Sequence, residues 1–120
     1  MLPEMRDAAY IWDILDASRT IVEFTRGLCL HDYLKDRKLQ LAVEREIEII
    51  GEAARRLSDS FKTMHPEVSW SRIISQRNIL AHEYGEIKQD RIFIVATVHI
   101  PELMELLTPL LPPIPPEMSQ

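Results

Sequence analysis

The sequence predicts an all-α fold, an antiparallel bundle of four to five helices in one domain. Apolar residues recur at three- and four-residue spacing over most of the chain, which is the pattern of amphipathic helices. The length of 120 residues is that of one domain. We therefore expect residues 1–111 to form a single helical bundle, and residues 112–120 to form a proline-rich extended or disordered tail.

Two long helices are expected in the first half of the chain. The first spans about residues 5–26, where apolar residues fall on one stripe, and Gly27 can end it. A short connector with room for one helical turn leads to the second helix, at about residues 36–58. Its inward side is predicted to be Leu39, Ala42, Val43, Glu46, Ile49, Ile50, Ala53 and Leu57.

The second long helix carries two polar or flexible features that need an explanation. Glu44 and Glu48 are four residues apart, and we interpret them as a solvated acidic face. Gly51 lies in mid-helix, where glycine costs about 1 kcal/mol relative to alanine. Close approach of a neighbouring helix would explain why the glycine is tolerated there.

The next helix is bounded by a proline and a glycine. Pro66 interrupts the chain, since proline breaks helices. The helix is expected to start near Ser69 or Trp70 and to end around Tyr84 and Gly85.

The last helical region is the least regular in its pattern. Asp90 is a good N-cap for a helix that runs through His99. Residues 92–100 are rich in β-branched side chains and would also suit a strand, but no other segment offers a strand partner. Pro101 is expected either to kink this helix or to separate a last short helix at 102–108.

Charge and composition restrict the class of protein. The net charge of −5 argues against broad electrostatic capture of nucleic acid and confines any such contact to a small site. The single cysteine, Cys29, fits a reducing compartment. No run of 18 apolar residues is present and the N-terminus carries acidic residues, so we expect a cytoplasmic protein with no membrane span.

The segment Arg-Asn-Ile-Leu-Ala-His-Glu-Tyr at residues 77–84 is the most informative stretch of the chain. Arg77 lies three residues after Ile74 and four after Ile73, so it continues the apolar stripe of its own helix. A charge stranded on such a stripe costs several kcal/mol unless it is paired. This turn is therefore either a satisfied structural network or a site.

Arg77 and His82 cannot easily act on one atom from one straight helix. They are five residues apart and diverge by about 140°. Two arrangements would bring them together: the helix end can unwind near His82, or a second copy of the motif can face the first across a two-fold axis.

The motif Arg77-x4-His82-x-Tyr84 resembles the R-x4-H-x-Y signature of HEPN-domain proteins, and in particular the HepT toxin family of bacteria and archaea. The segments IIGEAARRL, VSWSRIISQRNILAHEY and HIPELMELL are similar to that family in the same order, so the resemblance covers roughly residues 5–111. It implies a homodimer or higher homo-oligomer joined through the motif helices, with arginines and histidines lining a shared cleft that cleaves RNA without a metal.

The resemblance implies specific roles for the motif residues. His82 would transfer a proton and Arg77 would stabilise the charge on the phosphorane oxygens. Asn78 is within reach of the imidazole or of a phosphate, or caps the backbone. Glu52 pairs with Arg77, orients His82, or is a solvated helix glutamate. Tyr84 would receive AMP from a nucleotidyltransferase antitoxin, which would block the cleft, or it packs the helix end.

Other functional classes remain open. The chain could be a non-catalytic helical module that binds a nucleotide or docks a nucleotidyltransferase, or a structural dimer whose polar turn fixes register. We expect no cofactor. We also expect no metal site, because the spacing of His31, His65 and His99 does not match that of metal ligands.

Overall fold

The computed structural model describes the backbone at residues 3–82 and 88–111, and the side chains at residues 5–76 and 88–111. Every regular element in these ranges is helical, which confirms the all-α prediction. In chain order the elements are α1 (Pro3–Thr25), α2 (Leu30–Leu34), α3 (Arg37–Arg56), α4 (Asp59–Met64), α5 (Trp70–His82), α6 (Gln89–Ile94), the π-helix η1 (Val95–His99), α7 (Ile100–Leu107) and the 3₁₀ turn η2 (Thr108–Leu110). The tail from residue 112 lies outside this description.

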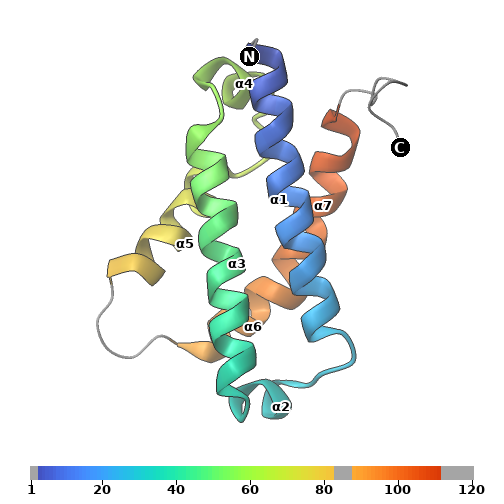
Figure 1. Ribbon diagram of the computed structural model, residues 1–120, viewed down its shortest axis with the longest axis vertical. Coiled ribbons are helices and arrows are strands. Elements are labelled where there is room, and N and C mark those ends of the chain that lie inside the picture. The colour runs from blue at the N-terminus through green and yellow to red at the C-terminus, as the bar shows by residue number, and fades with distance from the viewer. Residues whose placement is uncertain (1–2, 83–87, 112–120) are drawn as a thin grey trace.

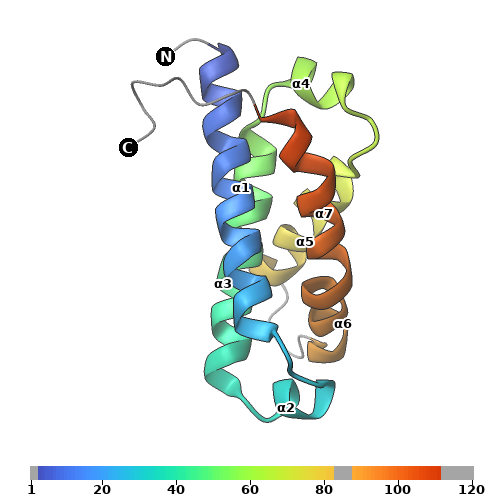
Figure 2. The same ribbon diagram turned by 90° about the vertical axis from the view of Figure 1, so that its right-hand side faces the viewer.

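The molecule is an antiparallel bundle built around α1 and α3, which lie side by side over most of their length (Figure 1). The helix α5 packs on α3, and α7 packs on α1 (Figure 2). Between them, these four helices enclose the core. The short helices α2 and α4 close opposite ends of the bundle (Figure 1).

The first long helix agrees with the sequence prediction. Its inward stripe contains the buried residues Ile11, Ile14, Leu15, Ala17, Ser18, Ile21 and Thr25. Gly27 follows two residues after the end of α1 with a φ of 76°, a left-handed conformation that favours glycine. The expected glycine stop is therefore confirmed.

The second long helix is rotated slightly relative to the prediction. Asp36 caps it by accepting a hydrogen bond from the Leu39 N–H at 3.0 Å. Its buried side is Gln40, Val43, Glu44, Ile47, Ile50, Gly51, Ala53 and Ala54. Gly51 is thus buried, as expected for a mid-helix glycine at a helix contact, and Ile47 replaces Ile49 as the fully buried isoleucine of its turn.

The prediction that Glu44 belongs to a solvated acidic face was wrong. Only 11% of its side chain is exposed, and its carboxylate accepts a hydrogen bond from Gln89 Nε2 at 2.9 Å. Arg37 Nη1 lies 3.6 Å from the same carboxylate. Glu44 can be buried because α6 brings Gln89 to it, and that contact spans 45 residues of sequence.

The chain between α3 and α5 contains a helix that the sequence did not predict. Ser58 caps α4 by accepting from the Phe61 N–H at 3.1 Å. Both Ser58 N and Ser58 Oγ donate to the carboxylate of Asp7, at 2.9 and 2.7 Å. This pair of hydrogen bonds fixes the start of α4 to the first turns of α1 and accounts for the burial of Asp7.

The last helical region is continuous where a kink or a separate last helix was expected. The N-cap is Lys88, and Asp90 lies inside the first turn of α6, so the predicted N-cap was wrong. Pro101 occupies the start of α7 directly after the π turn, where a missing N–H is tolerated. The π turn takes the place of the expected kink or break.

One described segment, Gln89–Leu110, is long and apolar enough to cross a membrane by length and composition alone, with a mean hydropathy of 1.4. Our expectation of no membrane span stays a prediction. Ile100, Leu103 and Leu107 of this segment are buried in the core, and 28% of its 18-residue window is buried.

Candidate functional site

The motif helix α5 is anchored at its first residue. The Trp70 indole Nε1 donates to the His65 carbonyl at 3.0 Å, and the indole packs edge-on against Phe61 with the ring centroids 6.1 Å apart. Trp70 is buried, while Ile73 and Ile74 are half-buried against the core. The predicted start of the motif helix is confirmed, and its apolar stripe faces the bundle.

The motif residues Arg77, Asn78 and His82 all lie on the described backbone of α5. Their side chains, and Tyr84 as a whole, lie outside the described residues. At about 100° per residue, position 77 falls about 40° from position 73, whereas position 82 falls about 180° from it. Because the backbone of α5 is helical through His82, positions 77 and 82 fall on different sides of the helix.

Glu52 lies on α3 within a network of arginines. Its carboxylate accepts from Arg55 Nη2 at 2.7 Å and from Arg56 Nε at 2.9 Å. The hydrogen bonds from Arg55 and then Arg56 lower the pKa of Glu52 to about 2, so the carboxylate is ionised at neutral pH. The two arginines are therefore partly neutralised, and the proposed pairing of Glu52 with Arg77 or His82 involves side chains outside the described residues.

Glu52 also lines a surface cavity of about 350 Å³ between α1 and α3. The cavity wall combines cations and anions with one aromatic ring: Tyr10, Asp13, Arg45, Glu48, Ile49, Glu52, Ala53 and Arg56. Arg45 Nη1 lies 3.4 Å from Glu48, and Arg56 is hydrogen-bonded to Tyr10 as well as to Glu52. Since its arginines are matched by carboxylates, this cavity has no clear excess of positive charge.

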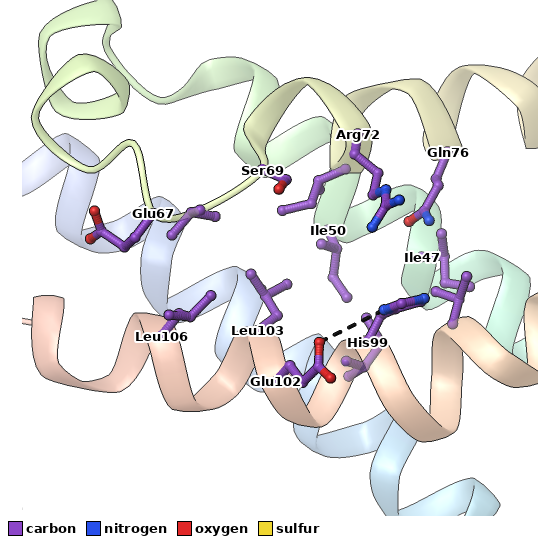
Figure 3. A pocket seen from close by; sticks show the side chains of 14 residues that line it. Ile47, Ile50, Glu67, Ser69, Arg72, Gln76, His99, Glu102, Leu103 and Leu106 are labelled. Carbon is purple, nitrogen blue, oxygen red and sulfur yellow. Dashed lines mark ion pairs between the residues drawn. The ribbon is translucent and has the colours of Figure 1, made fainter.

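A second, smaller cavity of about 100 Å³ lies between α5 and the η1–α7 segment. Its floor is apolar, and its rim carries polar side chains from both helices (Figure 3). Arg72 and Gln76 come from α5, and His99 and Glu102 come from the opposite wall. Gln76 and Glu102 were not identified as site residues from the sequence. The spacing of four between Arg72 and Gln76 could have indicated a shared polar face.

No group of three or more His, Cys, Asp or Glu residues with the geometry of a metal site occurs in the described part of the chain. His99 Nδ1 lies 3.8 Å from Glu102, and His65 Nδ1 lies 3.4 Å from Glu67, each as a separate pair. The polar groups described so far can bind and orient a ligand through hydrogen bonds and charge.

Comparison with known proteins places this chain among ribonucleases. The family model described as "Ribonuclease HepT-like" matches residues 14–110. A protein of Thermococcus cleftensis named "Probable ribonuclease HepT" is 45% identical over 75 residues, which cover 62% of this chain and 68% of the relative. Two proteins named "Putative RNase" are similar over more of the chain. The one from Methanocaldococcus jannaschii is 33% identical over 83% of each chain, and the one from Caldanaerobacter subterraneus is 35% identical over 78% of this chain and 84% of its own.

No solved structure is significantly similar to the chain. The matched range begins in α1 and ends in η2, so it includes the motif helix and nearly all of the described bundle. The chain therefore belongs to the HepT-like ribonuclease family.

Proposed function

We propose that this protein is a metal-independent endoribonuclease whose site is formed by Arg77 and His82 where two copies of α5 meet. The observation that carries the proposal is that both residues lie on one uninterrupted helix of a HepT-like ribonuclease. Within one copy these positions fall on different sides of the helix, so a shared site needs residues from two copies. A two-fold axis would bring Arg77 of each copy toward His82 of the other.

The proposed reaction uses the RNA as its own nucleophile. The 2′-hydroxyl attacks the adjacent phosphate, and the bond from phosphorus to the 5′-oxygen of the next nucleotide breaks. His82 transfers a proton in this step, since imidazole can accept and donate protons near neutral pH. Arg77 stabilises the charge that develops on the phosphorane oxygens. Asn78 and Glu52 support the site by orienting the imidazole or the phosphate.

A cleavage assay with a histidine variant tests this proposal. His82→Ala should lower the rate of RNA cleavage by about 10²–10⁴-fold, the usual contribution of a general acid or base. The matched control is His31→Ala, because His31 is exposed on α2 at the end of the bundle. Activity of the wild-type protein should persist in excess EDTA. Undiminished cleavage by His82→Ala, or loss on chelation with recovery on adding Mg²⁺, would refute the mechanism. Absence of cleavage by the wild-type protein would favour a docking or nucleotide-binding module.

We further propose that the protein is the toxin of a toxin–antitoxin pair and that a nucleotidyltransferase antitoxin attaches AMP to Tyr84. Tyr84 lies seven residues after Arg77 in the sequence, so a regular helix would place the two positions about 20° apart. A phosphodiester at Tyr84 would then compete with the RNA phosphate for Arg77. This modification would switch the ribonuclease off.

Intact-mass spectrometry after co-expression with the nucleotidyltransferase tests this switch. The wild-type protein should gain one or more AMP units at Tyr84, and growth arrest should be relieved. Tyr84→Phe keeps the ring but removes the hydroxyl, so it should stay unmodified and toxic beside the partner. Equal neutralisation of Tyr84→Phe, or AMP mapped to another residue, would show that the partner inhibits by another route.

A further inference from the structure

The cavity between α5 and the η1–α7 segment has the construction of a ligand site. Its floor is formed by apolar side chains from α3, from α5 and the residues just before it, and from the last helical region: Ile47, Ile50, Val68, Ile73, Val95, Ile100, Leu103 and Leu106. Polar groups are restricted to the rim. A concave apolar surface with a few convergent polar groups is the usual form of a small-ligand pocket.

Two polar side chains on the α5 wall have no partner within the described residues. Neither Arg72 nor Gln76 makes a hydrogen bond or an ion pair there. Figure 3 shows both side chains extending from α5 over the cavity toward His99 on the opposite wall. A guanidinium plane and an amide are thus available above an apolar floor.

The opposite wall is shaped by the π turn. In η1 the Ile100 N–H donates to the Val95 carbonyl, an i to i+5 hydrogen bond in place of the usual i to i+4. This widening brings Val95, His99 and Ile100 to the same cavity wall. Single π turns within helices are frequent at functional sites, and this one lies at the cavity.

The charges on the rim favour a neutral ring over a phosphate. Arg72 is one cation, whereas Glu67 and Glu102 contribute two carboxylates that would repel an anion. Glu102 lies 3.8 Å from His99 and points toward the cavity (Figure 3). A carboxylate and an amide beside a guanidinium match the mixed donors and acceptors along the edge of a nucleobase.

Size and position agree with a single base of a bound RNA strand. The volume of about 100 Å³ is well below the 300–1,000 Å³ of pockets for whole ligands, so one planar ring fits and a complete nucleotide does not. Gln76 directly precedes Arg77, and Ile73 lies four residues before it on the same side of α5.

We infer that this cavity, hereafter the α5–α7 pocket, is a nucleobase subsite for the single-stranded RNA substrate, an inference that rests on the proposed ribonuclease function. Arg72 stacks on the ring or hydrogen-bonds its edge, and Gln76 reads the edge beside it. Glu102 accepts a hydrogen bond from an exocyclic amino group. The subsite, sized for one ring, therefore prefers cytosine to uracil, which lacks that group.

Binding of non-cleavable oligonucleotides to the full chain tests the inference. The probes are fluorescein-labelled 2′-O-methyl hexanucleotides of cytidine, of uridine and of abasic units. Arg72→Ala should weaken binding of the cytidine probe about 10-fold, the loss expected when one base-stacking contact is removed, and should leave the weaker abasic binding unchanged. Glu102→Gln should reduce the preference for cytidine over uridine.

The matched control is Arg19→Ala, which removes the same charge from the exposed face of α1, where Arg19 lies 3.9 Å from Asp16. An equal loss for Arg19→Ala and Arg72→Ala, or an equal effect of Arg72→Ala on the cytidine and abasic probes, would overturn the subsite. A change in oligomeric state on Arg72→Ala with no change in base preference would assign the pocket to a second copy of the chain and would also overturn it.

The same variants separate this inference from the proposed function. If the wild-type protein cleaves RNA and Arg72→Ala binds every probe as the wild type does, the subsite is wrong and the ribonuclease stands. If the wild-type protein neither binds the probes nor cleaves RNA, the proposed function fails and the subsite fails with it. Circular dichroism of each variant verifies that the fold is retained.

Discussion

The two sides of α3 differ in how their polar side chains are satisfied. Toward α1, α2 and α6, the buried Asp7, Gln40 and Glu44 each have hydrogen-bond partners from another helix or loop, whereas the buried hydroxyls of Ser18 and Tyr33 have none among the described residues. Toward α5 and α7, the described side chains of Arg72 and Gln76 extend over a cavity without such partners. Polar contacts on the side facing α1, α2 and α6 therefore fix how the helices pack, whereas the side facing α5 and α7 keeps polar groups available to a ligand.

Gln40 illustrates the first kind of polar residue. Its amide Nε2 donates to the Tyr33 carbonyl at 3.0 Å and to the Leu34 carbonyl at 3.2 Å. These carbonyls belong to the last turn of α2, and the Tyr33 carbonyl also accepts from the Asp36 N–H at 3.2 Å. One buried side chain thus fixes the position of α2 against α3.

The largest expected difference between the two sides is in packing. Ile21→Ala should lower the free energy of unfolding by about 2–5 kcal/mol, because Ile21 is fully buried between the helices. Leu106→Ala, which lines the α5–α7 pocket with 39% of its surface exposed, should cost less than about 1 kcal/mol. Urea denaturation of both variants measures the difference. Equal losses would show that the side of α3 facing the pocket is as tightly packed as the side facing α1.

A smaller effect is expected for the two glutamates. Glu44→Ala leaves the buried Gln89 amide without its acceptor and should cost about 1–3 kcal/mol. Glu102→Ala, with 66% of its side chain exposed, should change the free energy of unfolding by less than about 0.5 kcal/mol. Thermal unfolding by circular dichroism compares the two. A neutral Glu44→Ala would mean that Gln89 readily finds another partner.

The smallest effect concerns Tyr33, which lies on the side of α3 that faces α1, α2 and α6 but has a polar group unpaired within the described residues. Its hydroxyl is buried and makes no hydrogen bond in the described part of the chain, so Tyr33→Phe should be neutral or stabilise the fold by up to about 1 kcal/mol at pH 7. Burial, and then the charge of Glu44, raise the pKa of Tyr33.

A raised pKa fixes the sign of the dependence on pH. The stability contributed by the neutral phenol is fully present below pH 10, the ordinary pKa of tyrosine, and is lost as the pH rises above it, because the unfolded chain ionises first. Wild type should therefore lose more stability than Tyr33→Phe between pH 9 and pH 11. Parallel losses in urea titrations at these pH values would contradict the burial of the hydroxyl.

The parts of the fold that local pattern determines could be predicted from the sequence. The apolar stripe of α1, the stop at Gly27 and the start of α5 at Trp70 depend on residues close together in the chain, and all three are confirmed. The short helix α4 was missed because its cap depends partly on Asp7, which is 51 residues from Ser58.

Long-range contacts also explain the other errors. Glu44 was assigned to solvent because its spacing from Glu48 fits an exposed face. Only the packing of α6 brings Gln89 to the Glu44 carboxylate as a hydrogen-bond donor. The π turn and the α5–α7 pocket depend on how the last helical region meets α5, which no local pattern encodes. The roles of Arg77, Asn78, Glu52, His82 and Tyr84 stay predictions, because they came from resemblance to a family.

The shared site across two copies of α5 is tested most directly by a mixed dimer. Arg77→Ala and His82→Ala chains carrying different tags are co-expressed and purified through both tags, so that every dimer contains one of each. The variants alone should be inactive, whereas the mixed dimer should regain roughly half of the wild-type activity, because one of its two sites keeps both residues. A mixed dimer as inactive as its parents would show that Arg77 and His82 act within one chain and would contradict the account.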